Sequence, residues 1–169
     1  MKANPALALL KKDHDTVKYL FDRFEKAQDR DAKRKIVEEA LIELKLLAAL
    51  EEQIFYPAIR TPVGIDIMNE AYQKHRAVKV LIAELECMDG REDHYDAKLT
   101  VLAEYVRHHI WAEENDVFPK AREASIDFEA LSDAIFERKQ ALLDGVVPLL
   151  PEPLEYWTTQ RKILAGVAG

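Results

Sequence analysis

Five side chains with metal-ligand chemistry lie in the two halves of the chain, and four of them occupy matching places. The five are three histidines and two glutamates, namely His14, Glu51, His75, His109 and Glu113. Imidazole and carboxylate groups together suit first-row metals such as iron, manganese or zinc, and a carboxylate can bridge two such ions. The spacing of four between His109 and Glu113 would place both on one face of a helix, one turn apart. This chemistry requires elements that bring distant segments together.

An internal repeat relates the two halves. The segment 14–20 aligns with 75–81 at an offset of 61 residues, and the segment 51–57 aligns with 113–119 at an offset of 62 residues. Two separate matches at nearly the same offset indicate a duplicated helix pair. We therefore expect a bundle with pseudo-two-fold symmetry.

Apolar residues step by three and four along most of the chain, which is the period of an amphipathic helix. The stripes predict helices from a cap at Asn4, from a cap near Asp29 to Pro57, from a cap at Asp66 to Gly90, up to Pro119, and over 127–144. Residues 57–66 hold two prolines and a glycine and predict a loop. The expected fold is all-α: an antiparallel up-down-up-down four-helix bundle with an additional C-terminal helix and tail.

The five candidate ligands lie on the inward faces of these predicted helices. Burying an unpaired carboxylate costs several kcal/mol by order of magnitude, so Glu51 and Glu113 need compensation. Lysines and arginines lie mostly off the stripes, which leaves the histidines and a metal ion. One such histidine alone would be read as an ordinary core residue, and one Glu-Glu pair as helix-end charge. Their occurrence in register across both repeats favours a metal site, whereas His94 is predicted to face solvent and His108 to lie on the surface or next to a ligand.

Composition limits the class of protein. The 169 residues carry 31 acidic and 24 basic side chains, a net charge of −7, which argues against a nucleic-acid partner. No segment has the layout of a membrane span, and the lone Cys87 favours a reducing compartment, so we expect a cytoplasmic protein. We expect one helical unit over 1–145 and a tail over 146–169 that packs on the bundle or on a partner.

At these motifs the chain resembles the hemerythrin-like, HHE cation-binding family, over roughly residues 7–122. That family has a histidine in the first helix, His-x-x-x-Glu in the second with an aromatic-proline exit, and then the same again. The exits here are Glu51-Glu52 before Tyr56-Pro57 and Glu113-Glu114 before Phe118-Pro119. The resemblance implies a bundle holding a non-haem di-iron centre. His14, Glu51, His75, His109 and Glu113 match its ligands, with both glutamates bridging the ions.

One ligand of the family pattern is missing. The repeat predicts a histidine at Leu47, and the oxygen carriers of the family would have another at Lys79. The ion nearest His75 and His109 would keep two imidazoles, and the ion nearest His14 only one. Three consequences stay open: a weakly held or absent second ion, a substitute ligand, or a metal-poor bundle. The substitutes considered are Glu43 and Tyr105, although a surface glutamate and an ordinary core tyrosine are the favoured interpretations.

The leading functional hypothesis is a metal-binding protein that binds or senses O₂, NO, peroxide or iron at non-haem iron, with manganese or zinc as other candidates. One alternative is a di-iron oxidase or peroxide-consuming enzyme, although no separate catalytic residue is assigned. Glu52 and Glu114 are the nearest acid/base candidates, and both are expected to face solvent. The other alternative is a structural module that binds a second copy or another protein through the fifth helix and the tail.

Overall fold

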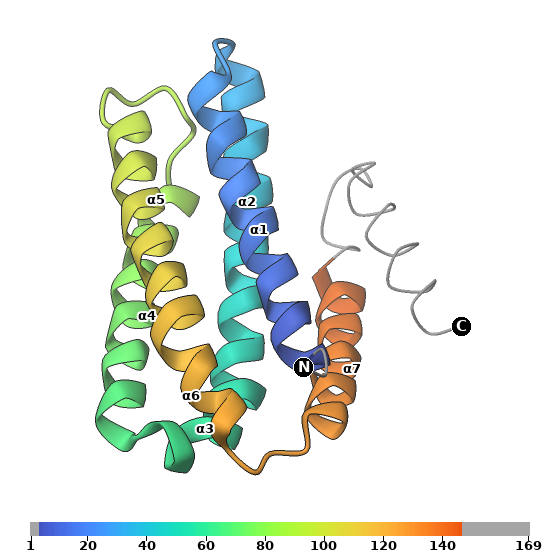
Figure 1. The fold of residues 1–169 in the computed structure, drawn as a ribbon. Coiled ribbons are helices and arrows are strands. Elements are labelled where there is room, and N and C mark those ends of the chain that lie inside the picture. The colour runs from blue at the N-terminus through green and yellow to red at the C-terminus, as the bar shows by residue number, and fades with distance from the viewer. Residues whose placement is uncertain (1–3, 147–169) are drawn as a thin grey trace.

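The chain is helical throughout the part that a computed structural model describes, residues 4–146 (Figure 1). Four long helices form the bundle: α1 (Pro5–Lys26), α2 (Arg30–Leu50), α4 (Ile65–Glu86) and α5 (Tyr95–Ala112). Helices α1 and α2 pack as one pair and α4 and α5 as the other, and α7 (Phe128–Val146) lies against α1. The predicted all-α bundle with a C-terminal helix is confirmed. The predicted tail lies outside the described residues, apart from the end of α7.

Side-chain caps begin the first two helices where the sequence predicts them. The Asn4 carboxamide oxygen accepts a hydrogen bond from the Leu7 backbone N–H at 3.1 Å, and an Asp29 carboxylate oxygen accepts one from Ala32 at 2.8 Å. The prediction that Asp66 caps the next long helix is wrong. Gly64, at φ 119°, precedes α4, because this backbone conformation is open to glycine and strained for other residues.

The predicted loop over 57–66 is also wrong for most of its length, because residues 56–63 form the short helix α3 (Tyr56–Val63). Pro57 lies in the first turn of α3, where a helix does not require a backbone donor. Pro119 occupies the same place in α6 (Phe118–Glu123), so it does not end the helical path either. Each half of the repeat therefore extends beyond its proline.

A five-residue π-helix joins each long helix to the short one that follows it. These segments are η1 (Glu51–Phe55) and η2 (Glu113–Val117), and each begins at a core glutamate. The Tyr56 N–H donates to the Glu51 carbonyl, and the Phe118 N–H donates to the Glu113 carbonyl, which is the i to i+5 pairing of a π-turn. The wider turn brings side chains five residues apart onto one face. The repeat seen in the sequence thus extends to an uncommon backbone feature.

Helix α7 covers α1 and the end of α2 through an apolar face that includes Leu131, Ile135 and Leu143. Lys139 lies within this interface and donates to the Asp13 carboxylate, with both side chains at most 10% exposed. A buried ion pair holds its partners in one geometry, because either charge left alone would be strongly disfavoured. The pair ties α7 to the helix that carries His14.

Replacing Lys139 by alanine is expected to lower the free energy of unfolding by about 3 kcal/mol, because Asp13 would stay buried without its counter-charge. Urea denaturation of the metal-free protein measures the loss. The exposed pair Arg34–Glu38 gives the control, and Arg34→Ala should cost much less, because water screens an exposed ion pair. A loss for Lys139→Ala no larger than for this control would show that the buried pair contributes nothing to the docking of α7.

Candidate metal centre

Four candidate ligands converge in the core of the bundle. Glu51 from η1, His75 from α4, His109 from α5 and Glu113 from η2 each offer one ligand atom, and these atoms all lie within 4.8 Å of one another. All four residues are buried. Residues from both halves of the repeat therefore meet at one point, although up to 62 positions separate them in the chain.

His14 joins this group from α1. Its Nε2 lies 3.2 Å from a Glu51 oxygen and 3.2 Å from a Glu113 oxygen, and the side chain is fully buried. The structure thus brings together all five residues that the sequence singled out. The inward stripes predicted this result, because each of the five occupies a core position on its own helix.

Two further glutamates hold the outer ring nitrogens of two histidines. His75 Nδ1 lies 2.8 Å from a Glu52 oxygen, and His14 Nδ1 lies 3.0 Å from a Glu114 oxygen. These carboxylate side chains are only 22% and 20% exposed, so the expectation that they face solvent is wrong. A carboxylate at Nδ1 fixes the ring orientation and leaves Nε2 to face the core, as is usual for metal-binding histidines.

The buried charges shift the pKa values of the group in opposite directions. Burial lowers the pKa of His14, but the carboxylates of Glu113, Glu114 and Glu51 outweigh it and raise this pKa well above its usual range. Burial also opposes the charge on His75, yet Glu51 raises the His75 pKa to about 9. At His109, burial is the largest influence and lowers its pKa, and the charges of His75 and His14 act in the same direction. Without a metal, the imidazolium forms of His14 and His75 therefore balance the buried carboxylates.

The residues fit a bound cation. Glu113 Oε2 is buried and accepts no hydrogen bond, although His14 Nε2 is 3.2 Å away. The single N–H that this nitrogen can carry is directed at Glu51, 3.2 Å away. A buried carboxylate oxygen without a donor is costly, and a metal ion among these atoms would satisfy it. Three imidazoles and two carboxylates form a mixed nitrogen and oxygen set that suits iron, manganese or zinc.

Tyr56 belongs to the site, and the helical pattern of the sequence did not place it there. Its fully buried phenol oxygen lies 3.0 Å from His75 Nε2 and 3.2 Å from His109 Nε2, and it donates to a Glu113 oxygen. Burial, together with the charges of Glu113 and Glu51, raises the pKa of Tyr56 well above its usual value. The aromatic-proline exit of the repeat was the available signal.

Neither substitute ligand considered from the sequence reaches the cluster. Tyr105 is 56% exposed, so its interpretation as a core tyrosine is wrong. Glu43 is buried rather than on the surface, but it lies eight residues before Glu51, about 12 Å along the helix. His94 is exposed, as predicted, and His108 is also exposed, which agrees with the first of its two expected positions.

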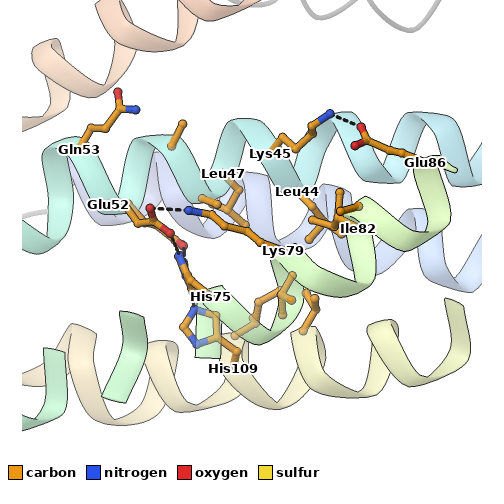
Figure 2. A pocket seen from close by; sticks show the side chains of 17 residues that line it. Leu44, Lys45, Leu47, Glu52, Gln53, His75, Lys79, Ile82, Glu86 and His109 are labelled. Atoms are coloured by element: carbon orange, nitrogen blue, oxygen red, sulfur yellow. Dashed lines mark hydrogen bonds and ion pairs between the residues drawn. The ribbon is translucent and has the colours of Figure 1, made fainter. Parts of the chain in front are cut away.

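A cavity of about 350 Å³ reaches the centre from between α2, α4 and α5 (Figure 2). Its inner wall includes Glu51, His75 and His109, and the missing-ligand position Leu47 lies beside them. The other walls are mostly apolar and include Leu44, Val78, Ile82 and Val106. At the rim, Lys79 pairs with Glu52 at 2.6 Å, and Lys45 pairs with Glu86. Both lysine side chains are about half exposed, so the cavity extends from solvent to the histidines.

Within residues 4–146, no helix has both the length and the apolar character needed to cross a bilayer. The acidic net charge is a property of the composition and does not describe any one face of the molecule. The candidate metal site is built from carboxylate and imidazole groups.

Comparisons with known proteins identify the family. The family model described as "Hemerythrin HHE cation binding domain" matches residues 6–121. A protein named DNA nickase from Nostoc sp. (strain PCC 7120 / SAG 25.82 / UTEX 2576) is 23% identical over 114 residues, covering 68% of this chain. The match spans only 32% of that relative's length. No solved structure matches significantly. The family match covers more than half of the chain, and it includes all five residues of the buried cluster, so the chain belongs to the hemerythrin HHE cation-binding family.

Proposed function

We propose that the chain is a metal-binding protein with non-haem iron at the buried cluster, where it binds or senses O₂, NO or peroxide. The observation that supports this most strongly is the convergence of His14, His75, His109, Glu51 and Glu113 at one place in the core. Iron held there would supply a coordination position for a small ligand. Manganese and zinc suit the same donors.

The cavity supports the binding of a small ligand beside the metal. Its apolar walls limit the water that reaches His75 and His109, and its volume of about 350 Å³ exceeds what a diatomic molecule or peroxide needs. Leu47 contributes to the wall where the family pattern would place an imidazole. The small molecule would therefore approach the metal through a space that is apolar because Leu47 stands where the family pattern has a histidine.

Metal analysis and absorption spectroscopy on protein produced with iron test this proposal. We expect at least about one iron per two chains, and a change in the spectrum when azide or NO is added. Removing the metal with a chelator should lower the melting temperature, because an ion that binds only the folded chain stabilises it. Protein without metal, or bound iron that responds to no added ligand, would contradict the proposal.

The same preparations separate the two alternatives. A structural module would bind little metal and show no shift in melting temperature with chelator. A peroxide-consuming enzyme would deplete peroxide over many turnovers, and His109→Ala would abolish that activity. The matched region is about a third of the DNA nickase, so we do not propose a nickase activity for this chain.

A further inference from the structure

The pseudo-two-fold repeat exposes an asymmetry at the centre. His14 corresponds to His75 and Glu51 to Glu113, so these positions have the same residue type in both halves. Two other pairs differ: Leu47 corresponds to His109, and Tyr56 corresponds to Phe118. In both unequal pairs, only one member can donate to a metal.

The contacts of Tyr56 and Phe118 place these two residues on opposite sides of the centre. The phenol oxygen of Tyr56 contacts His75 and His109, at 3.0 and 3.2 Å. The Phe118 ring instead stacks on His14, with centroids 5.7 Å apart and an interplanar angle of 11°. One side of the centre therefore has two imidazoles and a phenol, whereas the other has one imidazole next to an apolar ring.

The Tyr56 oxygen is surrounded by candidate ligand atoms. Besides its contacts to His75 and His109, it donates to Glu113, and the two imidazole Nε2 atoms are themselves 2.9 Å apart. The ring is fully buried and packs edge-on against Tyr72 at a centroid distance of 5.3 Å, so the hydroxyl cannot turn towards solvent. A buried phenol that only had to satisfy its own O–H donor would need one partner, whereas the Tyr56 hydroxyl contacts three.

We propose that the phenol oxygen of Tyr56 is a metal ligand, completing a five-donor set with His75, His109, Glu51 and Glu113 for one tightly held ion. This inference rests on the proposed function. On binding, the phenol O–H bond breaks, a metal–oxygen bond forms, and the proton now donated to Glu113 is released to solvent. The anionic oxygen favours ferric over ferrous iron by charge. The half around His14, without a counterpart of His109 or Tyr56, holds any second ion weakly.

Ferric-loaded full-length protein provides the test. A phenolate bound to ferric iron gives a visible charge-transfer band, and excitation in that band enhances phenolate ring vibrations in the resonance Raman spectrum. We expect both signals in the wild type and their loss in Tyr56→Phe. The same variant should bind ferric iron at least about tenfold more weakly. Losing a residue that only orients a metal ligand already weakens metal binding by about tenfold or more, and losing a ligand should cost at least as much. Tyr105→Phe, at an exposed tyrosine on α5, is the matched control and should keep both signals.

The outcomes distinguish this inference from the proposed function. Iron-loaded wild type without phenolate vibrations, or with vibrations that persist in Tyr56→Phe, would overturn the role of Tyr56 and leave the iron site standing. A wild type that binds no iron would overturn both. If Tyr56→Phe does not fold, wild type produced with ring-deuterated tyrosine decides the question. Raman bands that shift on deuteration support a tyrosine ligand, and unshifted bands exclude one.

Discussion

Replacing His109 by alanine is expected to reduce metal affinity by more than about 100-fold. Removing a residue that only orients a ligand costs up to about 100-fold, and removing a ligand should cost more. His109 is buried and offers its Nε2 within 4.8 Å of the ligand atoms of three other residues. Its loss would leave the tighter side of the centre with one imidazole. Metal content after dialysis and titration against a competing chelator measure the change.

The stability of the protein should report the same loss. Free metal at 100 times its Kd stabilises the native state by about 2.7 kcal/mol. For a chain of this size that is roughly 5–10 °C in melting temperature. We expect His109→Ala to abolish this metal-dependent shift. His108→Ala is the neighbouring control, because His108 is exposed and should leave the shift intact. Equal behaviour of the two variants would show that His109 does not hold the metal.

Metal affinity is expected to rise steeply between pH 6 and pH 9. In the metal-free protein the pKa of His75 is raised to about 9 and that of His14 is raised well above 6.5, so both bind protons through most of this range. An ion held through His75 must displace the His75 proton, and each proton displaced changes the apparent affinity by about tenfold per pH unit. An ion bound beside His14 displaces the His14 proton in the same way, so loading both sides of the centre steepens the slope.

The stability of the metal-free protein should change in the opposite direction. A histidine whose pKa is raised on folding stabilises the native state fully below its unfolded pKa of about 6.5, and this contribution is lost as pH rises to about 9. For His75 it is on the order of 3 kcal/mol. Denaturant unfolding with chelator should therefore show decreasing stability from pH 6.5 to 9. Chelator competition over the same range should show increasing affinity. A flat affinity profile would mean that no protonated imidazole is displaced by the metal.

The buried cluster of candidate ligands could be predicted from the sequence because its residues interrupt otherwise regular apolar stripes. His14, His75 and His109 occupy core positions of α-helices, and the three-four period places such positions correctly. The internal repeat then identified Glu51 and Glu113 as candidate ligands at matching positions. The order of the four long helices followed from the short links between them.

Tyr56 could not be found in this way because the helical period changes at Glu51. A continuous α-helix would turn Ile54 and Phe55 towards the core after Glu51. In η1 the turn contains an additional residue, so Tyr56 is fully buried and Ile54 is only partly buried. A single sequence does not reveal such a segment, since residues at π-turns have no strong local signature. The half-buried positions of Glu52 and Glu114 depend on their contacts to His75 and His14 and were missed for a related reason.

The two π-segments also make the site sensitive to the number of residues in each segment, and less sensitive to which residues they are. One residue fewer between Glu51 and Tyr56 would restore an α-helical path and turn every following side chain by about 100°. The exposed Gln53 lies in this stretch and contacts Arg138 on α7, at 2.9 Å. Its deletion would leave all six donor residues in the chain, yet the phenol would no longer point at the histidines. Among relatives of this chain, an insertion or deletion in these five residues therefore says more about the centre than many substitutions elsewhere.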